Sequence, residues 1–204
     1  MKKNKDAERD IINAARKAFY NKGFKEASMR DIATEANVNL AMVNYYFRSK
    51  ENLFYIIFDE AFGILYNKIA EIAGKESIDI IEKIKTIINE YCDFFNKQPY
   101  ILMFILGEVL RNPEKIGIRI RTKLQQSNAF SILNKQFETA IAKGVIKPVS
   151  TLSVVINILS LIIFPLLAKP LIKKALNIDS NVIDSILESR KQDVINIIIN
   201  SISP

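Results

Sequence analysis

Apolar residues recur three or four positions apart along almost the whole chain, which is the spacing of one face of an α-helix. One such stripe runs from Ile11 to Phe19, and a longer one runs from Phe54 to Ile72. The sequence shows neither the alternation typical of a half-buried strand nor an internal repeat. Gly and Pro, which often end helices, number only six each among 204 residues. The sequence therefore predicts an all-α fold.

Short breaks divide this pattern into about nine helices. Three short helices are expected before residue 50, a fourth after Ser49, and five more beyond it. The breaks contain residues that favour turns and helix ends: Gly23, Asn37, Gly74 to Ser77, Gln98-Pro99, Asn112-Pro113, Gly144 to Pro148, and Asn177 to Ser180. No Gly/Ser-rich linker separates the halves, so we expect the fourth helix to connect them.

The positive charge is concentrated in the first quarter of the chain. Residues 1–50 contain 11 Lys and Arg against 6 Asp and Glu, whereas residues 51–204 contain 18 against 16. A basic surplus favours a polyanionic partner, such as nucleic acid or an acidic membrane face. We therefore expect any polyanion to bind within residues 1–50.

The composition argues against several functional classes. The chain has one cysteine, Cys92, so it cannot form an intramolecular disulfide. It has no histidine, so it lacks the commonest general base and metal ligand. We find no Gly-rich phosphate loop and no nucleophile paired with a base. We expect no enzyme activity, no cofactor and no metal. The first ten residues are charged, with no apolar stretch behind them, so we expect no signal peptide and a cytoplasmic location.

One apolar stretch, Leu152 to Ala168, needs a membrane test. It is shorter than the roughly 20 residues that span a bilayer, and it contains Ser153, Asn157, Ser160 and Pro165. A helix buried in a dimer interface has the same composition. We therefore expect no membrane span.

Residues 28–47 have the layout of a helix-turn-helix, in which the second helix enters the major groove of DNA. Ser28 and Asn39 can cap the two helices, and Asn37 suits the tight turn between them. Because Val43 and Phe47 form the inner face of the second helix, the opposite face is left for DNA.

The residue types on that opposite face suit contacts to bases and phosphates. The predicted DNA-contacting residues are Ser28, Arg30, Asn39, Leu40, Ala41, Met42, Asn44, Tyr45, Tyr46 and Lys50. Asn39 serves equally well as a cap alone, and Tyr46 as a packing residue. Lys50 stands in the first turn of a helix, where the dipole disfavours a cation. That position favours an external phosphate partner over a structural role.

The segment from Gly23 to Phe54 is similar to the N-terminal domain of the TetR family of transcriptional regulators, and the likeness covers about residues 8–58. The matching positions are Gly23-Phe24, Ala27-Ser28, Ile32-Ala33, Val38-Asn39, Tyr45-Tyr46-Phe47 and Ser49-Lys50-Glu51-Asn52-Leu53. Asn37 and Asn39 replace the family's Gly and Ser or Thr but keep the required backbone chemistry. Ala41-Met42 and Asn44 replace a Gly-Thr pair and a Tyr on the expected DNA-facing side, which leaves the operator sequence open.

The resemblance implies a homodimer that binds a palindromic double-stranded operator, most often as a repressor, and is released by a small effector. It implies a DNA-binding domain over residues 1–50 and a helical regulatory and dimerisation domain over residues 51–204. The alternative is a helical small-molecule-binding or membrane-surface protein without sequence-specific DNA binding.

The C-terminal part offers candidates for effector binding and dimerisation. A largely apolar effector would fit a pocket formed by Tyr91, Phe95, Phe104, Glu108, Phe130, Asn134, Phe137 and Asn157. The aromatic residues of this set serve equally as core, and Glu108 could instead pair with Arg111 at the surface. We expect dimer contacts through residues 151–169 and 180–201. Their apolar stripes are Val154, Ile158, Leu161 and Ile162, and Val182, Ile183, Ile186, Leu187, Val194, Ile197, Ile198 and Ile202.

Overall fold

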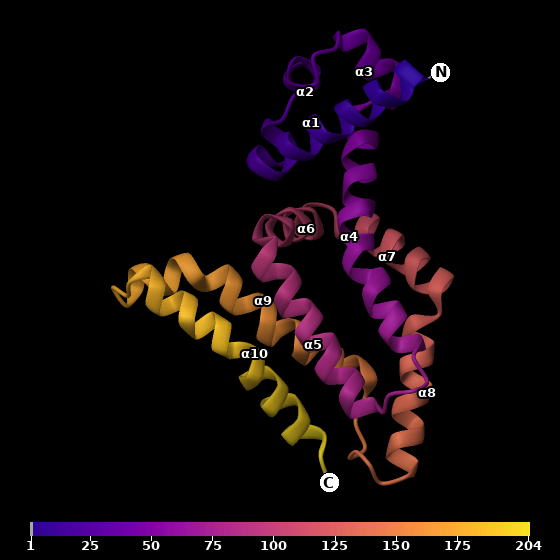
Figure 1. Ribbon diagram of the computed structural model, residues 1–204, viewed down its shortest axis with the longest axis vertical. Helices are drawn as coiled ribbons and strands as arrows, with labels where there is room; N and C mark the ends of the chain where they lie inside the picture. Colours follow the sequence, from indigo (N-terminus) through magenta and orange to yellow (C-terminus); the bar gives the residue numbers. More distant parts are fainter. Residues whose placement is uncertain (1) are drawn as a thin grey trace. The chain divides into compact units, whose positions relative to one another are not determined.

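The computed structural model describes residues 2–204, with side chains from residue 6 onward, and these residues form ten helices (Figure 1). In chain order the helices are α1 (Lys2–Glu26), α2 (Met29–Glu35), α3 (Leu40–Phe47), α4 (Lys50–Gly74), α5 (Ile80–Lys97), α6 (Pro99–Arg111), α7 (Pro113–Ser127), α8 (Ala129–Ala142), α9 (Thr151–Ala175) and α10 (Ser180–Ile202). Residues 2–204 contain no strand, and the predicted all-α fold is confirmed.

The tenth helix arises from a break that the sequence analysis did not predict. Asn128 adopts a left-handed backbone with φ of 53° and separates α7 from α8. The hydroxyl of Ser127 accepts a hydrogen bond from the Ala129 backbone at 3.2 Å. Asparagine tolerates this conformation better than most residues. The signal for the break was therefore one Ser-Asn pair inside an otherwise helical pattern.

The helices group into two compact units. The first contains the chain up to Ile64 together with Tyr100–Ile116, and the second contains Leu65–Pro99 and Gly117–Pro204. Helix α6 and the start of α7 thus belong to the same unit as α1, α2 and α3. The first unit is larger than the domain predicted over residues 1–50.

Aromatic side chains hold the first unit together. Phe19 of α1 and Phe54 of α4 have ring centroids 5.1 Å apart in an edge-on arrangement. Phe104 of α6 lies 4.9 Å from Phe54, and all three rings are buried. Buried aromatic rings contribute large apolar areas and preferred edge-on contacts. Helix α6 therefore shares one core with α1 and α4.

Gly23 changes the direction of the chain near the end of α1. Its φ of 73° lies in the left-handed region, which glycine adopts without a steric penalty. The helix end predicted at Gly23 is therefore observed as a break, after which residues 24–26 add a last turn.

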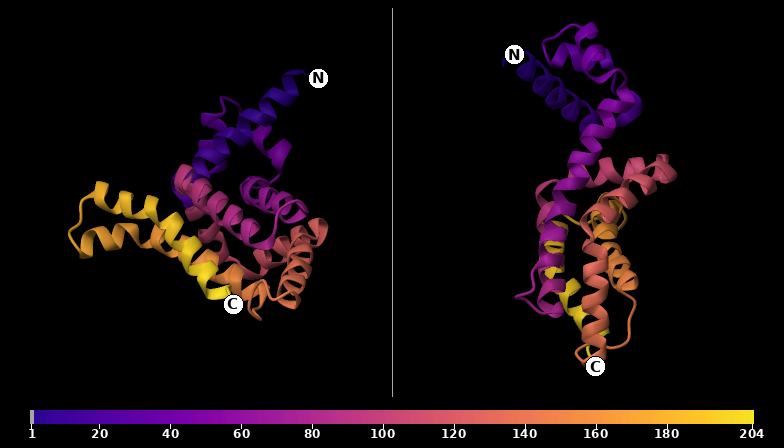
Figure 2. Two further views of the ribbon diagram at one scale, coloured as in Figure 1. Left: turned by 60° about the horizontal axis from the view of Figure 1, so that its bottom comes forward. Right: turned by 90° about the vertical axis from the view of Figure 1, so that its right-hand side faces the viewer.

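The second unit is built around α5, α8, α9 and α10. Helices α9 and α10 run side by side as a hairpin, and α10 also packs on α5 (Figures 1 and 2). Ile88, Phe95, Ile158, Val194 and Ile198 are among its buried side chains. This apolar core accounts for the helical stripes in the sequence.

Helix α9 contains Pro165, which cannot donate a hydrogen bond to the carbonyl of Leu161 one turn earlier. The Arg190 side chain of α10 donates to this carbonyl, with 3.3 Å between Nε and the oxygen. Because an unpaired buried carbonyl is costly, Arg190 helps α9 to continue as a helix through Pro165.

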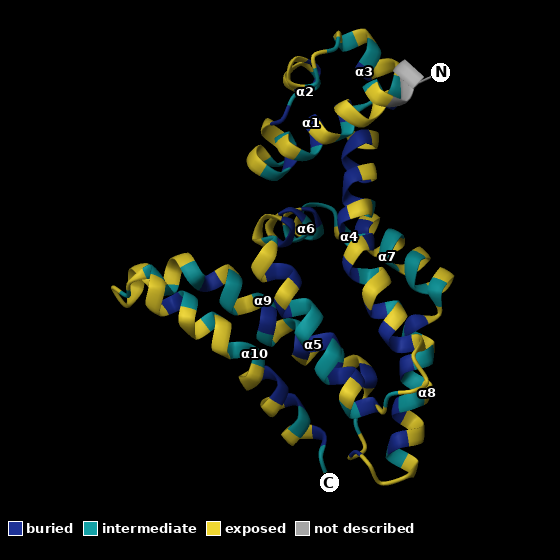
Figure 3. Cartoon of the chain, viewed as in Figure 1, coloured by how far each residue is buried: buried dark blue, intermediate teal, exposed yellow. Residues whose placement is uncertain are grey.

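Helix α9 is long and apolar enough to cross a membrane, and it is the one helix of that kind in residues 2–204. Its most apolar 18-residue window has a mean hydropathy of 2.4, and 28% of that window is buried. Core helices of soluble proteins meet the same length and composition test. Figure 3 shows exposed positions along α9 and α10.

The exposed apolar face of α9 differs from the stripe predicted for dimer contact, whereas that of α10 includes part of the predicted stripe. Predicted residues such as Val154, Ile158 and Ile162 are buried within the chain, as are Ile183, Val194, Ile198 and Ile202. Exposed instead on α9 are Leu152, Ile156, Phe164, Leu167 and Leu171. On α10, Val182, Ile186 and Ile197 are exposed, as predicted members of its stripe. Most of the predicted dimer stripe therefore faces the core of the second unit.

Candidate nucleic-acid interface

The turn between α2 and α3 is fixed by local hydrogen bonds. The Ser28 hydroxyl caps α2 by accepting from the Asp31 backbone nitrogen at 3.1 Å. The Asn39 side chain caps α3 by accepting from the Met42 backbone nitrogen at 2.8 Å. Between the helices, Asn37 has a φ of 54°. Both predicted caps and the predicted turn residue are confirmed.

Helix α3 has one buried face and one exposed face. Val43 is fully buried and Phe47 is 4% exposed, so these two side chains anchor the helix in the first unit. Ala41 and Asn44 are exposed, and Tyr45 is 77% exposed. An exposed amide, methyl group and phenol at helical spacing can reach the base edges of a major groove.

The ten predicted DNA-contacting residues lie on α2, α3, their caps and the first residue of α4. Exposed among them are Arg30, Asn39, Ala41, Asn44 and Tyr45, and half-buried are Ser28, Leu40, Met42, Tyr46 and Lys50. The Tyr46 ring lies 5.4 Å from that of Tyr45 and 6.1 Å from that of Phe47. Tyr46 therefore has packing contacts, and Asn39 has an established role as a cap.

Acidic residues of α2 are paired with lysines of α1. Lys17 Nζ lies 2.6 Å from a Glu35 carboxylate oxygen, and Lys22 Nζ lies 3.8 Å from one of Asp31. The hydrogen bond from Lys17, with its charge, lowers the pKa of Glu35. These pairs offset negative charge beside α3, where it would repel a phosphate backbone.

Lys50 has internal partners that the sequence analysis did not anticipate. Its Nζ donates to the carbonyl oxygens of Phe24 at 2.8 Å and Ala27 at 2.9 Å. The same nitrogen lies 4.5 Å from the centroid of the Phe24 ring. The sequence analysis favoured an external phosphate over a structural role for Lys50, but the structure shows a structural role, because the ammonium group binds the end of α1. A phosphate contact by Lys50 stays a prediction.

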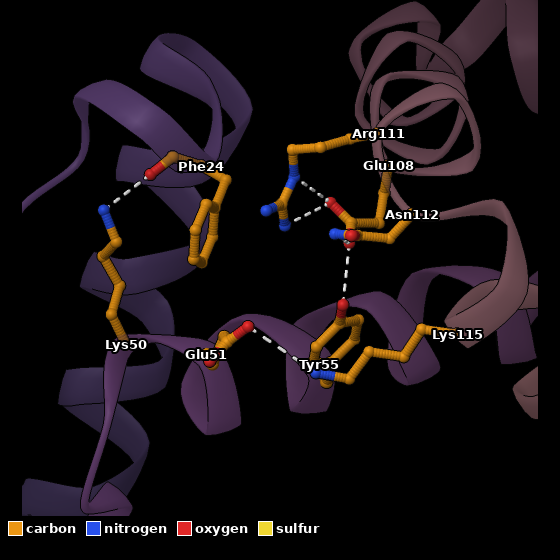
Figure 4. Close-up of polar contacts among 8 residues, drawn as sticks. All are labelled: Phe24, Lys50, Glu51, Tyr55, Glu108, Arg111, Asn112 and Lys115. Atoms are coloured by element: carbon orange, nitrogen blue, oxygen red, sulfur yellow. Dashed lines mark hydrogen bonds and ion pairs between the residues drawn. The ribbon is translucent and has the colours of Figure 1, made fainter.

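Glu108 is the centre of a buried polar cluster in the first unit (Figure 4). It is 2% exposed, and its Oε1 accepts from the Tyr55 hydroxyl at 2.8 Å and from the Asn112 amide at 2.9 Å. Its Oε2 accepts from Arg111 Nε at 2.8 Å. Burial and the hydrogen bond from its hydroxyl to Glu108 raise the pKa of Tyr55 to about 12. The carboxylate is thus satisfied by α4 and by its own helix.

Arg111 extends this cluster to the end of α1. Its guanidinium carbon lies 4.0 Å above the centre of the Phe24 ring, so the cation is placed between Phe24 and Glu108 (Figure 4). Lys115 lies 3.6 Å from Glu51 and 4.2 Å from the Tyr55 ring centroid. Stacking of a cation on an aromatic ring adds to the ion pair. The cluster joins α1, α4 and α6 within the first unit.

The residues predicted for an effector pocket are divided between the two units. Phe104 and Glu108 belong to the first unit, whereas Tyr91, Phe95, Phe130, Asn134, Phe137 and Asn157 belong to the second. Phe95 and Phe137 are buried in the core and Asn157 is exposed. Asn134 accepts from the Thr151 hydroxyl at 2.9 Å. The predicted pair of Glu108 with Arg111 exists, but Glu108 is buried and Arg111 is half-buried.

Among residues 6–204, no group of three or more Cys, Asp and Glu side chains is placed to hold a metal ion. The first unit presents an exposed helix on a capped turn, within residues 1–50, which carry 11 Lys and Arg against 6 Asp and Glu. That arrangement defines a helix-turn-helix DNA-binding domain.

Residues 11–55 match the sequence model of the family described as bacterial regulatory proteins, tetR family. This match confirms, for residues 11–55, the resemblance to the TetR family that was predicted over about residues 8–58.

The chain is also similar to a curated relative, the HTH-type transcriptional repressor NicS of Pseudomonas putida. The two are 27% identical over 146 residues, which are 71% of this chain and 62% of that relative. The chain thus spans less than two thirds of the length of the curated relative that it matches. The matched family and this relative are transcriptional regulators rather than enzymes.

Solved structures share the fold. A crystal structure of HlyIIR, a hemolysin II transcriptional regulator, is similar with a TM-score of 0.66 and 23% identity over 98% of this chain and 99% of that one. A TetR-like transcriptional regulator from Rhodococcus sp. RHA1 has a TM-score of 0.55 and 17% identity, over 91% of this chain and 93% of that one. At these identities the likeness concerns the fold alone.

Proposed function

We propose that the protein is a ligand-responsive transcriptional regulator, and specifically a repressor, that binds a palindromic DNA operator as a homodimer in the cytoplasm. The observation that carries this proposal is the exposed face of α3, with Ala41, Asn44 and Tyr45 presented by a helix whose other face is buried. The match of residues 11–55 to the TetR family supports it.

In the proposed complex α3 lies in the major groove. Asn44 forms two hydrogen bonds with adenine, and Ala41 contacts a thymine methyl group. Arg30 and the α2 cap hold phosphates. Tyr45 contacts the adjacent backbone or a base. Lys50 acts mainly by fixing the end of α1 against α4, because its nitrogen already donates to backbone carbonyl oxygens there.

The proposed dimer uses α9 and α10, through the apolar side chains that remain exposed in the protomer. Phe164 is 67% exposed and Leu171 is 69% exposed on α9, and Val182 is 50% exposed on α10. Soluble monomers rarely leave a large contiguous apolar patch in water. A second copy that covers the same face would form a symmetric four-helix interface.

Sedimentation of Phe164→Glu/Leu171→Glu tests this interface. The double variant should sediment as a monomer, because two buried carboxylates would have no partner. Ile118→Glu is the matched control, since Ile118 is 62% exposed on α7 and lies outside the proposed interface. A dimer that persists in the double variant would contradict the assignment.

A helical protein that associates with membrane surfaces is the second candidate, and the observation in its favour is the apolar length of α9. Capture of fragments from the source genome on the purified protein, alongside flotation with anionic vesicles, separates the two candidates. The proposed function predicts enrichment of one or a few palindromes. Vesicle binding with only salt-sensitive, sequence-independent DNA retention would overturn it.

A further inference from the structure

A cavity of about 620 Å³ lies in the second unit, between the loop that precedes α5 and one face of α8. Its apolar wall is formed by Ile78, Ile80, Ile132, Ala140 and Val145. The volume falls within the range of small-molecule sites, which are mainly apolar with a few polar groups. The polar groups of this cavity therefore indicate which ligand it suits.

The first polar group is Lys83, which is 2% exposed and contributes to the wall of the cavity. Its Nζ donates to the carbonyl oxygen of Ala73 and to Oε1 of Gln136, each at 2.9 Å. Both acceptors are neutral, and an ammonium group has three N–H donors. Within residues 6–204 Lys83 forms no ion pair, and the acidic charge that acts on it is that of Glu76, another residue of the cavity wall.

The other polar groups add to this positive charge. Lys135 and Lys143 are exposed at the cavity and form no ion pair in the described part of the chain. The cavity also has two acidic residues, Glu76 and Asp79. Asp79 is committed to capping α5, where its Oδ1 accepts from the Glu82 backbone at 2.9 Å. The lysines therefore outnumber the acids, and one acid has a local hydrogen bond.

We propose that this cavity binds a small organic anion with an apolar body, whose charged group is held by Lys83, Lys135 and Lys143. The isoleucines and Val145 contact the body of the ligand. Ammonium groups bind carboxylates and phosphates alike, so the class of ligand is defined by its negative charge and its apolar tail. Binding of the anion to this cavity does not depend on DNA binding by the protein. Naming this anion as the effector, however, rests on the proposed function.

Calorimetric titration of the full chain with octanoate, octyl phosphate and octanamide tests the proposal. The three probes have similar apolar chains, but octanamide is neutral. Both anions should bind, and octanamide should bind at least about tenfold more weakly, a difference of about 1.4 kcal/mol. Equal binding of octanoate and octanamide would overturn the role of the lysines.

Two pairs of variants locate the binding site. Thr139 is exposed and lines the cavity, so Thr139→Phe should fill the space and abolish octanoate binding. Ser131→Phe, at an exposed position of α8 that does not line the cavity, should leave it unchanged. Lys135→Ala/Lys143→Ala should weaken binding about tenfold, while removal of the exposed Lys174 should have no effect.

Circular dichroism of each variant shows that it is folded before titration. Octanoate binding that survives Thr139→Phe would contradict this location. Because the titration contains no DNA, its failure would leave the proposed regulator function untouched, and failure of operator capture would leave the binding site untouched.

Discussion

The side-chain nitrogen of Lys50 lies 2.8 Å from the carbonyl oxygen of Phe24 and 4.5 Å from the centre of the same residue's ring (Figure 4). One residue at the start of α4 therefore holds both the backbone and the side chain at the end of α1. Phe24 in turn supports Arg111, whose cation stacks on the ring at 4.0 Å. The position of α1 in the first unit depends on this sequence of contacts.

Lys50→Ala should lower the free energy of unfolding by about 2 kcal/mol, since hydrogen bonds from a charged donor and a cation–ring contact are lost. Asn44→Ala, at an exposed position of α3, should change it by less than about 0.5 kcal/mol. Urea denaturation of both variants measures the difference. Wild-type stability of Lys50→Ala together with weaker DNA binding would restore the phosphate-contact interpretation.

Glu108→Ala should lower the free energy of unfolding by about 3 kcal/mol, because it removes the counter-charge of Arg111. Tyr55→Phe should cost about 1.5 kcal/mol, because it removes one hydrogen bond to a charged acceptor. Lys68→Ala, which removes an exposed ion pair with Glu90, should leave the free energy of unfolding nearly unchanged. The test is the order of the three changes in the free energy of unfolding, measured by urea denaturation. A change in Glu108→Ala as small as that in Lys68→Ala would contradict the role of the buried carboxylate.

Alkaline pH should destabilise the fold through its tyrosines. Burial is the main cause that raises the pKa of Tyr20, Tyr55 and Tyr91 from 10.0 to about 12. Between these values the unfolded chain loses the phenol protons and the folded chain keeps them, so stability present below pH 10 is lost as the pH rises toward 12. In an alkaline titration, the absorbance of tyrosinate should rise in two phases, and the phase at higher pH should be smaller in Tyr91→Phe. One common transition for all tyrosines near 10 would contradict it.

The single cysteine should be unreactive in the folded protein. Cys92 is 8% exposed, and burial raises the pKa of its thiol from 9.0 to about 11. At neutral pH the folded state therefore presents little thiolate, which is the reactive form. A thiol-specific reagent should label Cys92 only after unfolding by denaturant. Rapid labelling of the folded protein would show that the thiol is accessible.

Local chemistry in the first fifty residues could be predicted because it depends on near neighbours in the sequence. Ser28, Asn37 and Asn39 each act on backbone within a few residues, so caps and the turn follow from residue type and spacing. The inner face of α3, with Val43 and Phe47, follows from helical periodicity.

Contacts between distant segments could not be predicted in this way. The partners of Lys50 are carbonyl groups of another helix end, which no sequence pattern marks. Glu108 gave a partial signal, because an acid within a strongly apolar helix requires a partner such as Tyr55. In α9 both faces are apolar, so periodicity did not distinguish buried Ile158 from exposed Phe164.

The central claim is that the exposed face of α3 recognises a DNA sequence. The most direct test is the affinity of wild type and Asn44→Ala for a captured palindrome and for a scrambled duplex, at one salt concentration. Loss of the amide should cost about 1–3 kcal/mol on the palindrome and leave the scrambled duplex unchanged. An equal loss on both duplexes, or none on either, would contradict recognition by α3.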